Sequence, residues 1–223
     1  MEPGRSRQLV TAALALAMFL AALEATAVGT AMPTVVAELG GVSRYSWVFS
    51  AYLLASTTTV PMYGKLADLF GRLRIITISV ALFLVGAALC GTAQSFPQLI
   101  VFRAIQGLGA GGVIPVAITI VGDIYSLEER GRIQGVFSGV WAVSSLVGPA
   151  AGGLITDLLS WRWVFYLNLP FGVASVVMLH LFLREEERRS SRRLDLAGTI
   201  SLTASIALLL LALQEGTELW GWG

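Results

Sequence analysis

Long apolar stretches recur along the chain and are separated by short polar or Gly/Pro-containing segments. A transmembrane helix needs about 20 mostly apolar residues, and seven stretches come close to or exceed that length. They cover residues 8–28, 47–64, 75–93, 99–121, 136–155, 164–183 and 196–213. Their apolar character is nearly continuous, which excludes the alternating pattern of a membrane β-barrel. The pattern therefore predicts an all-α, polytopic membrane protein with seven transmembrane helices.

Composition supports lipid as the solvent for most of the chain. Of its 223 residues, 56% are hydrophobic and 13% are charged, against about 25% charged in an ordinary soluble domain. A soluble protein of this size cannot bury so much apolar surface, because its exterior must be largely polar. The net charge of +1 provides no basic field for nucleic acid, which we exclude as a partner.

Residue types that carry enzyme or metal chemistry are scarce. One cysteine, Cys90, and one histidine, His180, cannot form an intramolecular disulfide or a zinc site. The sequence has no phosphate-binding loop, nucleophile elbow or metal-ligand set. We therefore predict that the protein is not an enzyme and that it binds no metal or cofactor.

Basic residues set the predicted orientation in the membrane. With the N-terminus inside, Arg44 and Arg162 lie outside and Arg103 lies within a span, which leaves 12 of the 15 Lys and Arg residues in cytoplasmic segments. A cleaved signal peptide is the alternative for the first stretch, but its length and the acidic Glu24 favour a retained helix. We expect a multi-pass protein of the cell membrane with a cytoplasmic N-terminus.

The connection between the second and third stretches reads GKLADLFGRLR. Gly64 and Gly71 permit a tight turn and close helix approach. Asp68 can pair with the positive N-terminus of a partner helix, and Arg72 follows it. We interpret these four residues as a breakable cytoplasmic latch.

A similar pattern occurs three stretches later, where Gly153-x-x-x-Asp157 is followed by Arg162. Three spans separate the two copies, so they lie on opposite membrane faces. This arrangement is typical of an inverted three-plus-three repeat. Chance similarity between short Gly/Asp turns is the alternative.

The latch segment resembles the G-x-x-x-D-x-x-G-R signature between helices 2 and 3 of the major facilitator superfamily. Four more stretches are similar to family motifs at the expected places, namely residues 23–33, 103–111, 148–153 and 161–170. The first and third of these resemble motifs of the fourteen-helix drug:proton antiporters. Two positions depart from the family pattern: Leu69 stands where a basic residue is common, and Ser144 where a glycine is expected.

The resemblance implies both a fold and a function. Residues 1–185 would form an N-terminal six-helix bundle, and residues 186–223 a cytoplasmic linker and a seventh span. The implied function is export of amphipathic, often cationic, drug-like compounds in exchange for protons, with the proton gradient as the energy source. Two bundles would rock about a central site. Since the sequence ends after seven spans, we expect a missing C-terminal bundle or a second copy of the chain to complete the transporter.

Two other functions stay open. A carrier of a metabolite such as a sugar, an amino acid, a siderophore or a lipid would share the fold. A non-transporting membrane scaffold derived from half a transporter belongs to a different class. The acidic residue of the first helix and the Gly-Pro motif of the fifth favour the antiporter.

Gly148, Pro149, Gly152 and Gly153 form the antiporter motif of the fifth stretch, according to the resemblance. From the residues alone, Ser144, Gly148 and Gly152 repeat every four positions and offer one face to a neighbouring helix. Pro149 removes a backbone donor. Ordinary small-residue packing without a role in antiport is the alternative.

The fourth stretch places Arg103, Gln106, Gly107 and Ala110 on one helical face. Such a polar and small face is unsuited to lipid, and we expect it to line a cavity. A purely structural arginine held by backbone carbonyls is the alternative.

Glu24 and Arg103 are the candidates for proton coupling. At about 1.5 Å per residue, Glu24 lies about 13 Å from Pro33, taken as the outer end of the first span, and Arg103 about 9 Å from Pro97. In the resembled fold, helices 1 and 4 both border the central cavity. We hypothesise that Glu24 alternates between a proton and a drug cation, with Arg103 adjusting its proton affinity. A permanent structural ion pair is the alternative.

Overall fold

The computed structural model describes residues 3–183, 198, 201–209 and 212. Seven α-helices and one 3₁₀ turn run in the order α1 (Pro3–Leu39), η1 (Val42–Arg44), α2 (Tyr45–Phe70), α3 (Arg72–Thr92), α4 (Phe96–Ile124), α5 (Leu127–Leu158), α6 (Arg162–Tyr166) and α7 (Asn168–Phe182). Residues 201–209 are also helical. The expected linker and parts of the seventh span lie outside the described residues.

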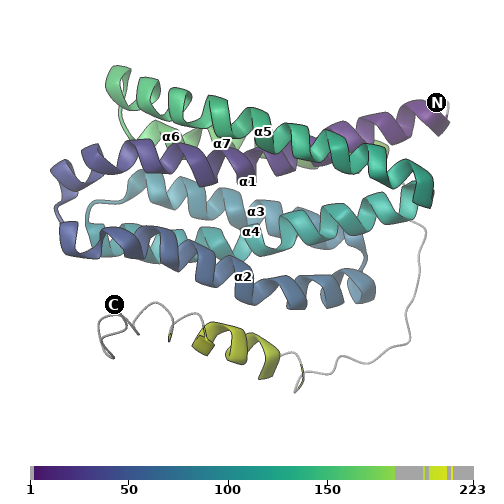
Figure 1. Cartoon of the computed structure of the whole chain (residues 1–223), viewed down its shortest axis with the longest axis horizontal. Coiled ribbons are helices and arrows are strands. Elements are labelled where there is room, and N and C mark those ends of the chain that lie inside the picture. Colours follow the sequence, from purple (N-terminus) through teal and green to yellow (C-terminus); the bar gives the residue numbers. More distant parts are fainter. Residues whose placement is uncertain (1–2, 184–197, 199–200, 210–211, 213–223) are drawn as a thin grey trace.

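The long helices lie side by side along a common direction (Figure 1). Helix α4 packs most extensively against α3 and α2, whereas α1 packs most extensively against α5 and α7. The two groups meet where α3 contacts α6 and α7 and where α1 contacts α4. An inverted repeat produces this pattern. When the first three spans are exchanged with the next three, α4 corresponds to α1 and α2 corresponds to α5. The α4–α2 contact therefore corresponds to the α1–α5 contact.

Local sequence signals begin and separate the helices. Ser95 caps α4, where its Oγ accepts a hydrogen bond from the backbone N–H of Gln98 at 3.4 Å. Ser126 and Glu129 form a capping box at the start of α5, with the backbone N–H of each bonded to the side chain of the other. Gly71 joins α2 to α3 with a φ of +93°, a conformation that favours glycine. This confirms the tight turn predicted there.

Within the described residues, five helical segments are long and apolar enough to cross a membrane. They are Arg5–Leu39, Arg72–Thr92, Phe96–Ile124, Leu127–Leu158 and Arg162–Phe182. They correspond to the first, third, fourth, fifth and sixth predicted spans. The second predicted span lies in α2, which is helical over 26 residues and rich in Ser, Thr and Tyr. Hydroxyl groups in its middle bond to carbonyls of the same helix, as when Thr58 donates to Leu54 O at 2.7 Å.

Two helix boundaries differ from those expected. Helix α1 continues through Pro33 to Leu39, so Pro33 is not the end of the first helix. A proline costs one backbone hydrogen bond, which membrane helices tolerate when their neighbours compensate. The sixth span is divided into α6, which ends at Tyr166, and α7, which begins at Asn168, but Leu167 between them keeps helical backbone angles (φ −56°, ψ −29°), and its N–H bonds to Trp163 O at 2.9 Å.

Two apolar clusters fill the interior, one towards each end of the bundle. The first contains much of residues 10–20 of α1 together with Phe83 and Ile120. The second contains much of residues 23–35 of α1 together with Trp161. The candidate site lies where one cluster gives way to the other.

Candidate functional site

Four buried polar side chains lie between the two apolar clusters. Glu24 belongs to α1, Arg103 and Gln106 belong to α4, and Asn168 is the first residue of α7. Each is at most 1% exposed. We call these four residues the polar layer.

Glu24 and Arg103 form an ion pair inside this layer. Nη1 of Arg103 donates to Oε1 of Glu24 and also to Oε1 of Gln106, at 2.8 Å. Nδ2 of Asn168 donates to Oε2 of Glu24 at 2.6 Å, so each carboxylate oxygen has a donor. Removing one partner from a buried ion pair typically costs about 3–5 kcal/mol, because an uncompensated charge is left behind.

Helices α2 and α3 also contribute to the layer. Nε of Arg103 donates to Val48 O at 3.2 Å, and its guanidinium carbon lies 4.2 Å from the centroid of the Tyr52 ring, a cation–π geometry. Sγ of Cys90 donates to Oε1 of Gln106 at 3.6 Å. The polar layer therefore joins spans from both predicted repeats.

The expected cavity wall on α4 is a packed helix contact in this structure. Gln106 is 0% exposed and Arg103 is 1% exposed. A Cβ added at Gly107 would collide with the backbone of Tyr52, so this glycine allows α2 to approach closely. A small and polar helical face serves equally well to receive a neighbouring helix. The sequence pattern alone could not distinguish that role from cavity lining.

Glu24 is the group of the polar layer that can bind and release a proton. With Glu24 ionised, the charges of Glu24 and Arg103 compensate each other. A proton on Glu24 would turn the pair into a neutral acid beside a guanidinium, and the layer would gain one positive charge. An ionisable residue inside a membrane is a candidate functional group on physical grounds, because its burial is expensive.

The predicted latch residues lie at the junction of α2 and α3. Arg72 forms an ion pair with Asp123 near the end of α4 and a longer contact of 3.6 Å with Asp68, whose side chain is 57% exposed. Helix α2 runs to Phe70, so Gly64 and Asp68 lie within a helix rather than in a loop. A Cβ added at Gly64 would meet nothing within 4 Å among the described residues, so close packing there does not require a glycine.

Asp123 is a partner of Arg72 that the sequence analysis missed. It lies at the cytoplasmic end of the fourth span in the predicted topology, on the same membrane face as Arg72. A carboxylate and an arginine at adjoining helix ends on one membrane face could have suggested the pair.

The small residues of the fifth span face a neighbouring helix, as their spacing predicted, and that helix is α1. A Cβ added at Gly148 would collide with the side chain of Thr26, and one added at Gly152 would collide with the backbone of α1. Oγ1 of Thr26 donates to Ser144 O at 3.1 Å. Close approach of the two helices along Ser144, Gly148 and Gly152 is therefore confirmed.

The other two motif residues of α5 are less closely packed than Gly148 and Gly152. A Cβ added at Gly153 would meet nothing within 4 Å among the described residues. Pro149 lies inside the helix and is only half-buried. The structure thus shows a need for glycine at Gly148 and Gly152 of the motif, but not at Gly153.

A second polar cluster ties helices at the other end of the bundle. Glu38 near the end of α1 accepts from Nε1 of Trp161 at 2.8 Å and from Nη1 of Arg162 at 2.7 Å. Nη2 of Arg162 also donates to Ala93 O, just after α3, at 3.3 Å. Trp161 is 0% exposed and packs edge-on against Phe165, so it is a core residue rather than an anchor at the membrane interface.

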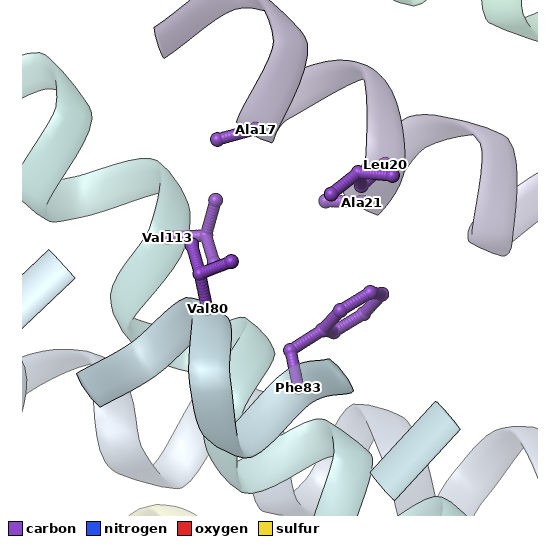
Figure 2. Close-up of a pocket in the computed structure, with 6 residues that line it drawn as sticks. All are labelled: Ala17, Leu20, Ala21, Val80, Phe83 and Val113. Atoms are coloured by element: carbon purple, nitrogen blue, oxygen red, sulfur yellow. The ribbon is translucent and has the colours of Figure 1, made fainter. Parts of the chain in front are cut away.

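An apolar gap lies between α1, α3 and α4 (Figure 2). It is lined by Ala17, Leu20, Ala21, Val80, Phe83 and Val113. None of these side chains could orient a polar ligand. In the described part of the chain, no group of three or more His, Cys, Asp or Glu side chains could hold a metal ion.

Known proteins resemble this chain in sequence. The model of the Major Facilitator Superfamily matches residues 14–221. The Multidrug transporter protein MdtP of Bacillus subtilis is 42% identical over 216 residues, which cover 97% of this chain and 40% of the relative. The Multidrug resistance protein 3 of the same species is 41% identical over 217 residues, covering 97% and 42%. The Efflux pump FUS6 of Gibberella moniliformis is 39% identical over 220 residues, covering 96% and 39%.

A solved structure also resembles this one. The human organic anion transporter MFSD10 matches with a TM-score of 0.73 over 91% of this chain and 54% of that chain. Its sequence identity of 19% limits this match to the fold. The chain thus spans about two fifths of the length of its curated relatives, 40% and 42% for the two from Bacillus subtilis.

Proposed function

The chain belongs to the major facilitator superfamily, whose members are transporters rather than enzymes, and on this premise we propose that it forms the N-terminal part of a proton-coupled multidrug exporter. Several of its relatives are named as multidrug transporters or efflux pumps. The proposed substrates are amphipathic, often cationic, drug-like compounds. The proposed site is the cell membrane, with the N-terminus in the cytoplasm.

The buried pair of Glu24 and Arg103 carries this proposal. A carboxylate in the membrane interior is costly, and its placement between two apolar clusters makes it costlier still. A simple facilitator has no need of a protonatable group there. An antiporter needs one group whose charge changes with the proton supply, and Glu24 has the chemistry for that role.

The geometry supports proton binding at Glu24 more than direct binding of a drug cation. Both carboxylate oxygens already accept hydrogen bonds, from Arg103 and Asn168, and Glu24 is 1% exposed. A proton needs no space, whereas a drug-sized cation would have to displace α4 or α7. We therefore assign the proton to Glu24 and the drug to a central site shared with the rest of the transporter.

Coupling follows from a shift of populations. Protonation of Glu24 removes its attraction to Arg103, which weakens one of the links between α1 and α4. A transporter that exposes its drug site differently in two conformations changes their ratio when such a link is weakened. The proton gradient then biases the two conformations on the two sides of the membrane.

The test uses a full-length transporter that carries this chain, reconstituted in proteoliposomes. We expect drug-dependent proton flux that Glu24→Gln abolishes and Glu24→Asp partly retains. Glu128→Gln removes the same charge from an exposed position on α5 and should transport normally. Proton-coupled drug export by Glu24→Gln with an unchanged pH dependence would exclude Glu24 as the coupling site.

The same assay separates the open alternatives. A metabolite carrier would couple protons to a sugar, an amino acid, a siderophore or a lipid and not to drugs. A scaffold would conduct no substrate-dependent proton flux. Either result would contradict the proposed exporter.

A further inference from the structure

Asn168 occupies the point where the polar layer meets the junction of α6 and α7. It is the first residue of α7, directly after Leu167, and it is 1% exposed. Its Nδ2 donates to Oε2 of Glu24 at 2.6 Å and also to Phe165 O at 3.2 Å. Its Oδ1 is buried and has no hydrogen-bond partner among the described residues.

The two protonation states of Glu24 make opposite demands on Asn168. An ionised carboxylate only accepts hydrogen bonds, whereas a protonated one must also donate. Arg103 has donors only and cannot accept that proton. Oε1 of Gln106 already accepts from Arg103 and from Cys90. Oδ1 of Asn168 is therefore the acceptor that remains among the side chains hydrogen-bonded to Glu24.

An asparagine can serve both states by turning its side-chain amide. With Nδ2 towards Glu24 it donates to the carboxylate, as the structure shows. With the amide turned over, Oδ1 accepts from the protonated acid, and Nδ2 moves away from Phe165 O. That carbonyl lies at the end of α6 and then loses a side-chain donor.

We infer that Asn168 is a positioning residue that transmits the protonation of Glu24 to the junction of α6 and α7, by turning its amide from donor to acceptor. In the step, Glu24 Oε2 takes a proton from a hydronium ion, which leaves as water, and the new O–H donates to Asn168 Oδ1. The hydrogen bond from Asn168 Nδ2 to Phe165 O is given up. This inference rests on the proposed function of Glu24 as the proton site.

The other groups that face Glu24 are compatible with this step. Arg103 of α4 contacts the carboxylate directly. Tyr52 of α2 and Cys90 of α3 lie within electrostatic range of both charges. Among the described residues of α5, α6 and α7, Asn168 is the one whose side chain bonds to Glu24. The proton-dependent change should therefore travel along α7 rather than α5.

The test measures hydrogen exchange of peptides that cover residues 162–172, in the full-length transporter reconstituted in lipid and corrected for the intrinsic pH dependence of exchange. We expect exchange at this junction to become about fivefold faster on acidification, the change expected when an ordinary hydrogen bond is lost from a local opening equilibrium. Glu24→Gln should show the faster exchange at every pH, because a neutral side chain imitates the protonated acid.

Variants of Asn168 test whether this residue transmits the protonation of Glu24 to the junction. Asn168→Ala and Asn168→Leu should abolish the pH dependence of exchange at the junction, and Ala serves if Leu prevents folding. Ser175→Ala is the matched control, since Ser175 is buried on the same helix and bonds to Ala13 O of α1 at 2.8 Å, away from Glu24. It should keep the wild-type response.

Two results would overturn the inference. One is an unchanged pH response at the junction in Asn168→Ala. The other is a wild-type junction that does not respond to pH although Glu24→Gln still abolishes proton-coupled export. That second outcome would leave the proposed function intact, whereas proton-coupled export by Glu24→Gln would remove the proposed function itself.

Discussion

Arg103 and Glu24 differ in how firmly they are held. Arg103 bonds to Glu24, to Gln106 and to the Val48 carbonyl, and its guanidinium stacks on Tyr52. Glu24 has donors from only α4 and α7 among the described residues. The arginine is therefore the fixed member of the pair. We therefore expect the proton to bind to Glu24, and Glu24 rather than Arg103 to move.

The first prediction concerns the energy of this pair. Arg103→Met leaves Glu24 buried without its counter-charge and should lower the free energy of unfolding by about 3–5 kcal/mol. Adding Glu24→Gln in the same molecule removes the orphaned charge, so we expect the double variant to recover part of that loss. Unfolding followed by circular dichroism in detergent gives the free energy of unfolding of the wild type, the two single variants and the double variant, which together form a double-mutant cycle. Strictly additive losses would mean that the two residues do not stabilise each other.

The sequence could reveal some residues of the site but not others. Glu24 and Arg103 stand out because charges are rare within apolar spans. Asn168 is neutral, and nothing in its type indicates which helix it faces or that it bonds to Glu24. Gln106 and Gly107 were expected to line a cavity because a face that receives another helix has the same composition.

At the scale of elements, small residues decide which helices touch. Helix α5 is exposed over most of its length, yet Ser144, Gly148 and Gly152 are buried along one line against α1. Their spacing was sufficient to predict a close helix contact. It was not sufficient to identify α1 as the partner, because that depends on the order in which the spans assemble.

The second prediction compares two adjacent glycines of α5. Gly152→Ala puts a methyl group into the backbone of α1 and should destabilise the protein by about 1–3 kcal/mol through overpacking. Gly153→Ala has open space and should be neutral, or stabilising by up to about 1 kcal/mol through helix propensity. Thermal unfolding of the two variants measures the difference. Equal effects would contradict the packing of α5 on α1.

The third prediction separates two acidic residues of the latch. Asp123→Asn removes the close partner of Arg72 and should lower the unfolding temperature of this part of the protein. Asp68→Asn should change stability little, because its side chain is 57% exposed and only distantly paired. We nevertheless expect Asp68→Asn to impair export in a full-length transporter, far more than Leu69→Arg does. Normal export by Asp68→Asn would restrict Asp68 to a topological role.

At the scale of the whole molecule, two ion pairs occupy corresponding places at opposite ends. Arg72 at the start of α3 pairs with Asp123 near the end of α4. Arg162 at the start of α6 pairs with Glu38 near the end of α1. When the first three spans are exchanged with the next three, α3 corresponds to α6 and α4 corresponds to α1. The pair of Arg72 and Asp123 then corresponds to the pair of Arg162 and Glu38. This supports the inverted repeat that the sequence indicated from Gly153, Asp157 and Arg162, although Asp157 itself is not part of the second pair.

The fold follows from the sequence more directly than its details do. Apolar length predicts each span because lipid requires about 20 residues to cross it. The ends are less predictable, since a helix can continue into the polar region until a capping residue or a glycine stops it. Helix α1 therefore runs past Pro33 to Leu39, and α2 reaches Phe70 before Gly71 ends it.

The last prediction tests the orientation of the whole bundle through the two ends of α5. This helix has 32 residues, about 48 Å at 1.5 Å per residue, which exceeds the hydrocarbon thickness of about 30 Å. Leu127 at its start is 81% exposed and Leu159 just past its end is 66% exposed. The basic residues predict that Leu127 lies in the cytoplasm and Leu159 outside.

The measurement uses single cysteines at these two positions in a full-length transporter, with Cys90→Ala removing the native thiol. We expect an impermeant thiol reagent to label Leu159→Cys in intact cells, and Leu127→Cys only after the membrane is permeabilised. The two positions are apolar, exposed and at the two ends of one helix, so burial of either residue cannot account for the result. Because the Arg72 latch and the Glu38 cluster lie at the same two ends, labelling of Leu127→Cys from outside would reverse the assignment of both. It would place the Arg72 latch on the outer face.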